Sequence, residues 1–144
     1  VMCINFGATF ATVTAQDGMS NTVLLAEVRT GSHLSANDPR GVWALGMPGG
    51  SVISAGYTWD CTKPNNKDAD ADDAEGAVND PKGGMGAWQP CPFQQATARS
   101  RHTGGVQVAL SDGSVRFIKN TITQQNWWRM CGVDDGMTVN VEEQ

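Results

Sequence analysis

The chain has 144 residues, of which 17 are glycine and 17% are charged, and its net charge is −5. This length suits one domain with its own apolar core, so we expect a single domain over residues 1–144. The frequent glycines and few charges favour a turn-rich β or α+β protein over a helical bundle. The acidic charge argues against nucleic-acid partners, and no stretch approaches the roughly 18 apolar residues that cross a bilayer.

The first part of the chain predicts extended structure. Residues 1–16 are β-branched and small, and they predict a strand or an extended segment. Asp17-Gly18 then predicts a turn, and residues 22–28 read T-V-L-L-A-E-V, an apolar run suited to a strand buried on both faces. Its length also fits a helical turn. Glu27 lies near the end of this run, and a carboxylate in a buried strand needs a partner.

The middle of the chain predicts two strands and then a long loop. Residues 41–45 and 52–59 have strand-like composition and are separated by Met47-Pro48-Gly49-Gly50. From about residue 61 to residue 92 the periodicity disappears, and Pro, Gly, Asn and Asp dominate. We therefore expect an irregular loop or insertion at 61–92.

The last part of the chain predicts a hairpin at 105–118 around Asp112-Gly113. This dipeptide suits a type I′ turn, which needs positive φ at both central residues. If Ser111 faces Ser114 across the turn, then Leu110 faces Val115. Val108 then faces Phe117 on the same apolar face of the sheet.

After the hairpin, Thr123 can cap a short helix at 124–130, and a last strand is expected at 137–141. The whole pattern predicts a β-rich α+β fold, with a mostly antiparallel sheet, one short helix and one large loop.

Four cysteines are widely spaced, and none forms a C-x-x-C pair that would indicate zinc. An even number of separated cysteines fits disulfides formed in an oxidising compartment, although four buried free thiols are the alternative. Three pairings satisfy the sequence. We favour Cys61 with Cys91, which closes the least regular part of the chain, and Cys3 with Cys131, which ties its two ends.

Two features suggest ligands. Asp68, Asp70 and Asp72 stand at alternate positions, as in the first half of an EF-hand, but Asp73 and Asn79 occupy the places of its glycine and glutamate. These carboxylates make a candidate calcium site, with a solvated acidic loop as the alternative. Trp88, in a glycine-rich setting, is the candidate for stacking on a sugar ring, although tryptophans more often pack in cores or interfaces.

His102 is the candidate for acid/base chemistry, paired with Asp112 or with Glu27. No G-x-S-x-G elbow or phosphate loop accompanies it. A neutral imidazole can instead fix a strand end to a carboxylate or carbonyl, and we expect that structural role and no enzyme. Ser20 and Asn21 are similarly expected to bond local backbone after the turn.

Two sequence patterns resemble a known family. His102, nine residues and then Asp112-Gly113 resemble the prepilin-type processing-associated signature of secreted pilin-like proteins of planctomycetes, in the domain of unknown function 1559 family. Upstream, D-G-M-S-N-T-V-L-L-A-E, from Asp17-Gly18 through Ser20 and Asn21 to Glu27, is similar to a second segment of that family.

The resemblance implies the C-terminal head of a pilin-like protein, related to type IV pilus or type II secretion subunits. Such a protein is a secreted, non-enzymatic structural subunit of an extracellular filament or cell-envelope assembly. Its partners are copies of itself or other pilin-like subunits, and it meets the membrane only through an N-terminal helix absent from this sequence. We expect the precursor to supply that helix. Some pseudopilins bind calcium in a C-terminal loop. An extracellular carbohydrate- or solute-binding module is the alternative, and the resemblance itself implies no cofactor.

Overall fold

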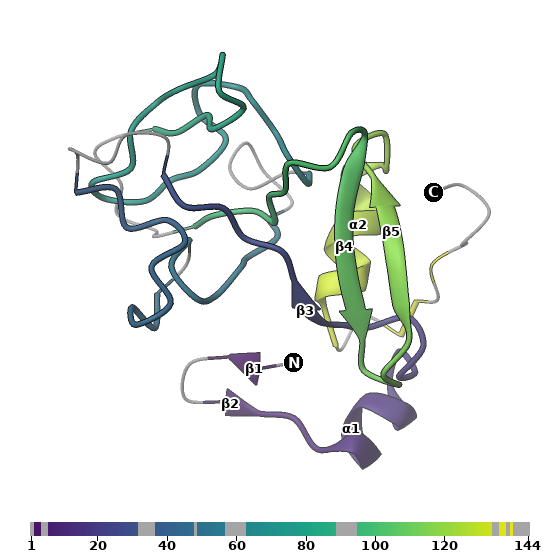
Figure 1. Ribbon diagram of the computed structural model, residues 1–144. Coiled ribbons are helices and arrows are strands. Elements are labelled where there is room, and N and C mark those ends of the chain that lie inside the picture. Colours follow the sequence, from purple (N-terminus) through teal and green to yellow (C-terminus); the bar gives the residue numbers. More distant parts are fainter. Residues whose placement is uncertain are drawn as a thin grey trace.

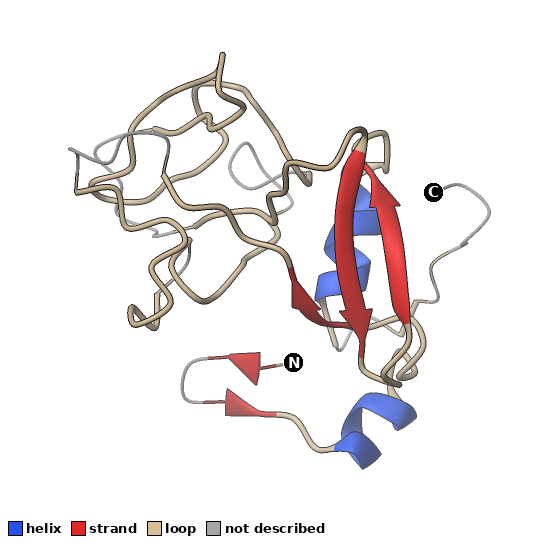
Figure 2. Cartoon of the chain, in the orientation of Figure 1, coloured by secondary structure: helices blue, strands red, loops and turns tan. Residues whose placement is uncertain are grey.

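The computed structural model describes residues 2–3, 6–31, 37–47, 49–56, 63–88, 95–133, 136–137 and 139. Figure 1 shows a sheet with a helix behind it beside a region of winding loops, and Figure 2 shows how little of that region is helix or strand. We call its described residues from 27 to 104 the loop region. Its extent is greater than the expected loop at 61–92.

The described elements confirm a β-rich α+β fold. A three-stranded antiparallel sheet has the order β3-β4-β5, and a two-stranded sheet pairs β1 with β2. The strands are β1 (Met2–Cys3), β2 (Phe6–Gly7), β3 (Val23–Ala26), β4 (Gly105–Leu110) and β5 (Val115–Lys119), and the helices are α1 (Phe10–Ala15) and α2 (Gln124–Cys131). None of the helices described here is long and apolar enough to cross a bilayer.

The hairpin of β4 and β5 is confirmed, but its turn differs from the prediction. The Gly113 N–H donates to the Leu110 carbonyl at 2.9 Å, and the Leu110 N–H donates to the Ser114 carbonyl at 2.8 Å. Gly113 has a φ of +84°, whereas Asp112 keeps an ordinary negative φ. This is a three-residue loop with a glycine bulge rather than a two-residue type I′ turn.

The extra turn residue shifts the register by one. Ala109 pairs with Val115 and Gln107 pairs with Phe117, so the predicted pairs of Leu110 with Val115 and Val108 with Phe117 are wrong. A shift of one residue moves every side chain of a strand to the opposite face. Val115 and Phe117 consequently lie on the exposed face, which we call the outer face of the sheet.

We expect Gly113→Val to destabilise the domain by about 1–2 kcal/mol, because a β-branched side chain at positive φ clashes with its own backbone. No atom outside the neighbouring residues lies within 4 Å of the position that a Cβ would take. The loss of stability therefore measures backbone strain without a clash with other parts of the fold. Gly113→Asn is the matched variant, since Asn tolerates this conformation, and it should cost less. Urea unfolding measures both. Equal stability of the Val and Asn variants would contradict the assigned turn.

The inner face of the sheet carries the apolar core. Val23, Val106, Val108, Leu110 and Ile118 pack there against α2. The helix supplies Trp127 and Met130, both essentially buried. As predicted, Thr123 caps α2: its hydroxyl accepts a hydrogen bond from the Asn126 N–H at 3.2 Å.

The strand β3 is confirmed, but it is not buried on both faces. A bulge at Leu24 separates the pair of Val23 and Leu110 from the pair of Leu25 and Ala109. The bulge inserts one residue, and Leu25 consequently turns to the outer face, where it is 55% exposed.

Other predictions of secondary structure differ from the structure in whole or in part. Within residues 1–16, the expected extended structure is present in β1 and β2, but the segment also contains α1, which begins where the Thr9 hydroxyl caps the Thr12 N–H at 3.1 Å. The fold therefore has two helices among the described residues, not one. Residues 41–45 contain turns instead of a strand, and of 52–56 only Val52 makes a bridge. Their backbone bonds to other loop residues, as the Ser54 N–H does to the Ala96 carbonyl at 2.8 Å. Residues 57–59 and most of 137–141 lie outside the described part.

Candidate functional site

The two sequence patterns that suggested a family lie side by side in the fold. Their backbones pair as β3 and β4, and additional hydrogen bonds join them at both ends of the pair. The site is therefore built from residues that are about 80 positions apart in the chain, such as Glu27 and Gln107.

At one end, Glu27 follows β3 directly and is held by two donors. Its Oε1 lies 3.0 Å from His102 Nε2, and its Oε2 accepts a hydrogen bond from the Gln107 N–H at 2.7 Å. The His102 ring meets Phe117 edge-on, with ring centroids 6.4 Å apart. The expected partner of the Glu27 carboxylate is thus His102 together with the backbone of β4.

At the other end, the hairpin turn is bonded to the segment before β3. The Asp112 N–H donates to the Met19 carbonyl at 3.2 Å, and the Ser111 N–H donates to the Thr22 carbonyl at 2.8 Å. Hydrogen bonds from the Ser114 hydroxyl, the Ser114 N–H and the Ser20 side chain lower the pKa of Asp112 below its ordinary value. His102 and Asp112 lie beyond opposite ends of β4, so they do not form an acid/base pair.

The turn at Asp17-Gly18 holds its neighbours by local bonds. Gly18 has a φ of +81°, and the Asn21 side-chain amide donates to the Asp17 carbonyl at 3.2 Å. Asp17 is buried, and its Oδ1 accepts from the Gly136 N–H at 2.7 Å. Asn21 therefore bonds local backbone as expected, whereas the Ser20 side chain bonds the Asp112 carboxylate of the hairpin turn instead.

Ser100, close to His102 in sequence, is engaged with backbone. Its hydroxyl donates to the Gly105 carbonyl at 2.6 Å and accepts from the His102 N–H at 3.1 Å. The arrangement around His102 therefore connects the end of the loop region to the first residues of β4.

A second cluster, which we call the arginine network, consists of Asp38, Arg40, Asp72 and Arg99. All four side chains are buried. Arg40 binds Asp38 with two nitrogens, through Nε to Oδ1 at 3.0 Å and Nη2 to Oδ2 at 2.8 Å, and its Nη1 reaches Asp72 Oδ2 at 2.8 Å. Carbonyls of Gly86 and Val78 accept the remaining two N–H groups, so all five donors of the guanidinium are used.

Arg99 completes the network from the other side of Asp72. Its Nε donates to Asp72 Oδ2 at 2.7 Å, and its Nη atoms donate to the carbonyls of Asn66, Gly84 and Gly86. Asp72 Oδ1 accepts from the Thr97 N–H at 3.1 Å. Two arginines thus tie together loops whose buried apolar side chains, apart from Met85, are mostly alanines, three of which form a small cluster, Ala74, Ala77 and Ala87.

The opposite charges of the arginine network stabilise each other in their ionised forms. Burial alone would raise the pKa of Asp38, but hydrogen bonds from the Arg40 side chain, the Val78 N–H and the Arg40 N–H lower it below its ordinary value. Burial alone would lower the pKa of Arg40, and Asp38 and Asp72 raise it above its ordinary value. The stabilisation from Asp38 is present above the ordinary aspartate pKa, about 3.9, and is lost as the pH falls through the lowered value.

Sequence reasoning missed this network and gave Asp72 a different role. Asp72 points at two arginines, whereas Asp68 and Asp70 are exposed. Within the described ranges, no three His, Cys, Asp or Glu side chains are grouped as a metal site would require. Calcium binding by Asp68 and Asp70 stays a prediction, and it would have to proceed without Asp72.

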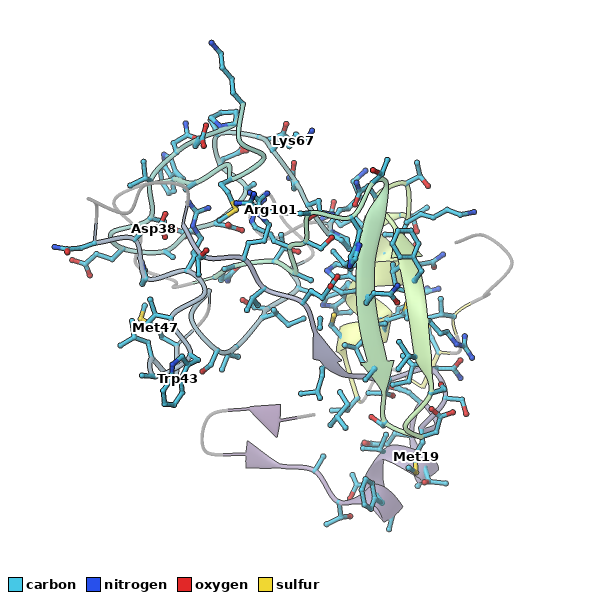
Figure 3. All side chains as sticks on the ribbon, in the orientation of Figure 1. Met19, Asp38, Trp43, Met47, Lys67 and Arg101 are labelled. Atoms are coloured by element: carbon cyan, nitrogen blue, oxygen red, sulfur yellow. The ribbon has the colours of Figure 1, made fainter. Side chains whose placement is uncertain are left out.

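The other candidate residues are placed only in part. Trp88 is 49% exposed, so its ring is accessible for stacking, and Trp43 is more exposed still at the tip of the loop region (Figure 3). Cys61 and Cys91 lie outside the described residues, as does the side chain of Cys3. Cys131 is half-buried in α2. The disulfide pairing stays a prediction.

An apolar groove of about 440 Å³ runs beside the free edge of β3. Its lining includes Leu24 and Ala26 of β3, Ile53 and Ala55 of the loop region, and Trp128 of α2. It is the most apolar of the described cavities.

The geometry defines a small α+β domain in which two distant segments are joined by hydrogen bonds and a buried ion network organises the loops. Residues 1–125 match the family described as "Protein of unknown function (DUF1559)", and the chain belongs to that family. No curated protein and no solved structure matches the chain.

Proposed function

We propose that this protein is a non-enzymatic, secreted, pilin-like structural subunit of an extracellular filament or cell-envelope assembly, which contacts copies of itself or other pilin-like subunits. Membership of the DUF1559 family supports the proposal. The His102 to Gly113 pattern supports it further, because its residues serve to join strands and turns. Contact with a membrane would come only through a pilin-type N-terminal helix.

The observation that carries the proposal is the uncovered outer face of the sheet. Leu25, Ala109 and Val115 form one row across the three strands, and Phe117 lies in the next row. Leu25, Val115 and Phe117 are 55%, 67% and 41% exposed. Contiguous apolar patches of more than about a few hundred Å² are rare on soluble monomers, and contact with another protein is one of their common uses.

The apolar groove beside β3 favours a second candidate, an extracellular ligand-binding module. Its volume of about 440 Å³ is in the range of small-molecule sites. Its lining, which is mainly aliphatic and includes Trp128, suits an apolar group better than a sugar. The first proposal is preferred because the exposed apolar side chains of the outer face lie in adjacent rows across the strands, and Val115 and Phe117 lie outside the groove.

Photo-crosslinking of the full gene product in cells tests the proposal. A photoreactive phenylalanine analogue at position 115 should give adducts with a second copy of the protein or with another pilin-like subunit, recovered with the envelope or with filaments. Val42, which is 38% exposed in the loop region, is the matched control position and should give few adducts. Recovery as a monomer from the medium, without adducts at position 115, would contradict a structural subunit and favour the binding module.

A further inference from the structure

A cleft where the loop region meets β4 gathers positive charge. It has a volume of about 390 Å³, and its charged lining consists of Arg29, Lys67, Lys82 and Arg101, with His102 at one side. We call this the basic cleft. None of the residues that line it is acidic. Figure 3 labels Arg101 where the loop region approaches the sheet.

The basic cleft contrasts with the rest of the chain. The protein has a net charge of −5 and only 10 lysines and arginines. Four of these 10 line one cleft. Like charges placed together repel each other unless an anion lies between them, so such grouping in an acidic protein needs a reason.

Arg29 shows this repulsion most clearly. Burial lowers its pKa from the ordinary value, and the nearby guanidinium groups of Arg101, Arg99 and Arg40 lower it further. Asp80 is the carboxylate that opposes the effect. Burial is the largest cause, but the contribution of the three guanidinium groups is one that a negative charge placed among them would offset.

One buried donor at the cleft has no acceptor in the described part of the chain, and three of its cations have no carboxylate partner there. Arg29 Nη1 donates to the Gly83 carbonyl at 3.1 Å, but its Nε is buried without a hydrogen-bond partner there. A buried donor left unsatisfied is costly, and it usually indicates a missing water or ligand. Among the same described residues, Lys67, Lys82 and Arg101 form no ion pair.

We propose that the basic cleft binds a small oxyanion, namely a carboxylate, phosphate or sulfate group of a soluble ligand. Guanidinium groups present parallel N–H donors that fit two oxygens of such a group, and ammonium groups add point charges. The uncharged lining, which includes Thr103 and Asn120, supplies polar contacts for the rest of the ligand. The cleft borders the outer face, because His102 at its side meets Phe117, but none of Leu25, Val115 and Phe117 lines it. The proposal does not depend on the proposed structural role.

Titration with inorganic phosphate tests the proposal. At constant ionic strength, phosphate should shift the amide signals of Gly83, Gly84 and Gly104 saturably and raise the melting temperature, because a ligand of the folded state stabilises it. Arg101→Gln, or Lys67→Gln with Lys82→Gln, should weaken binding about tenfold or more, as loss of charge-assisted bonds does. Lys119→Gln removes the same charge from exposed β5 and should leave the affinity unchanged.

Two outcomes would overturn the proposal. Either phosphate causes no saturable shift, or Lys119→Gln weakens its effect as much as Arg101→Gln does, which would indicate general screening of charge. Competition then separates the ligand classes: displacement of phosphate by glucuronate supports a carboxylate ligand, and resistance to it supports a phosphate or sulfate ligand. Self-association that phosphate abolishes would instead assign the cleft to an acidic segment of a second copy and reject the small ligand.

Discussion

Replacing Arg99 by methionine is expected to destabilise the protein by about 3–5 kcal/mol, because it leaves the carboxylate of Asp72 buried with fewer donors. The same change removes donors from the carbonyls of Asn66, Gly84 and Gly86. Methionine keeps much of the volume of the side chain, so the effect measures charge and hydrogen bonding rather than a cavity. Denaturant unfolding of the purified protein gives the free energy.

Arg101→Met is the matched control for this experiment. Arg101 lies two positions further along the same segment, and it is exposed. Its replacement should change the unfolding free energy by less than about 0.5 kcal/mol. If the two variants were equally stable, the arginine network would not be what organises the loop region.

The second large effect is expected from Gly86→Ala. A Cβ at this position would run into the carbonyl oxygen of Asp68 and lie 2.7 Å from the carbonyl carbon of Lys67. Both contacts are with backbone, which cannot move aside as a flexible side chain can. We expect a cost of about 3 kcal/mol, at the upper end of overpacking effects, since the Gly86 carbonyl also accepts from Arg40 and Arg99.

Gly46→Ala is the control for the glycine experiment. No atom lies within 4 Å of a Cβ at Gly46, and its φ is not positive. This variant should be within about 0.5 kcal/mol of the parent protein. Thermal unfolding monitored by circular dichroism compares the two. A Gly86→Ala protein as stable as the Gly46→Ala protein would show that the backbone at 67–68 does not pack on Gly86.

The sequence predicts those elements whose signals are local. The hairpin at Asp112-Gly113 and the helix capped by Thr123 depend on a few adjacent residues, and both are present. The register of the hairpin is not predicted, because a two-residue and a three-residue loop both suit Asp-Gly. That difference of one residue decides whether Val115 and Phe117 are core or surface.

The sequence predicts the candidate site only where a residue, by its type and position, requires a bonding partner. A carboxylate at the end of an apolar strand requires a partner, and Glu27 has one in His102. The arginine network gives no such local signal, because Asp72 lies 32 positions from Arg40 and 27 from Arg99. Alternating aspartates in a polar loop suggest a metal. Only the fold shows that arginines occupy the place of one.

Hydrogen bonds hold Glu27 through its N–H, its carbonyl and its carboxylate, and they couple the local unfolding of β4 to that of the loops. Its N–H donates to the Gln107 carbonyl at 3.3 Å, its carbonyl accepts from the Arg99 N–H at 2.8 Å, and its carboxylate holds Gln107 and His102. One residue therefore belongs at once to the edge of the sheet and to the loops. Amide protons of Arg99 and Gln107 should then exchange with solvent in a single cooperative opening, so that loops without regular secondary structure share the protection of β4.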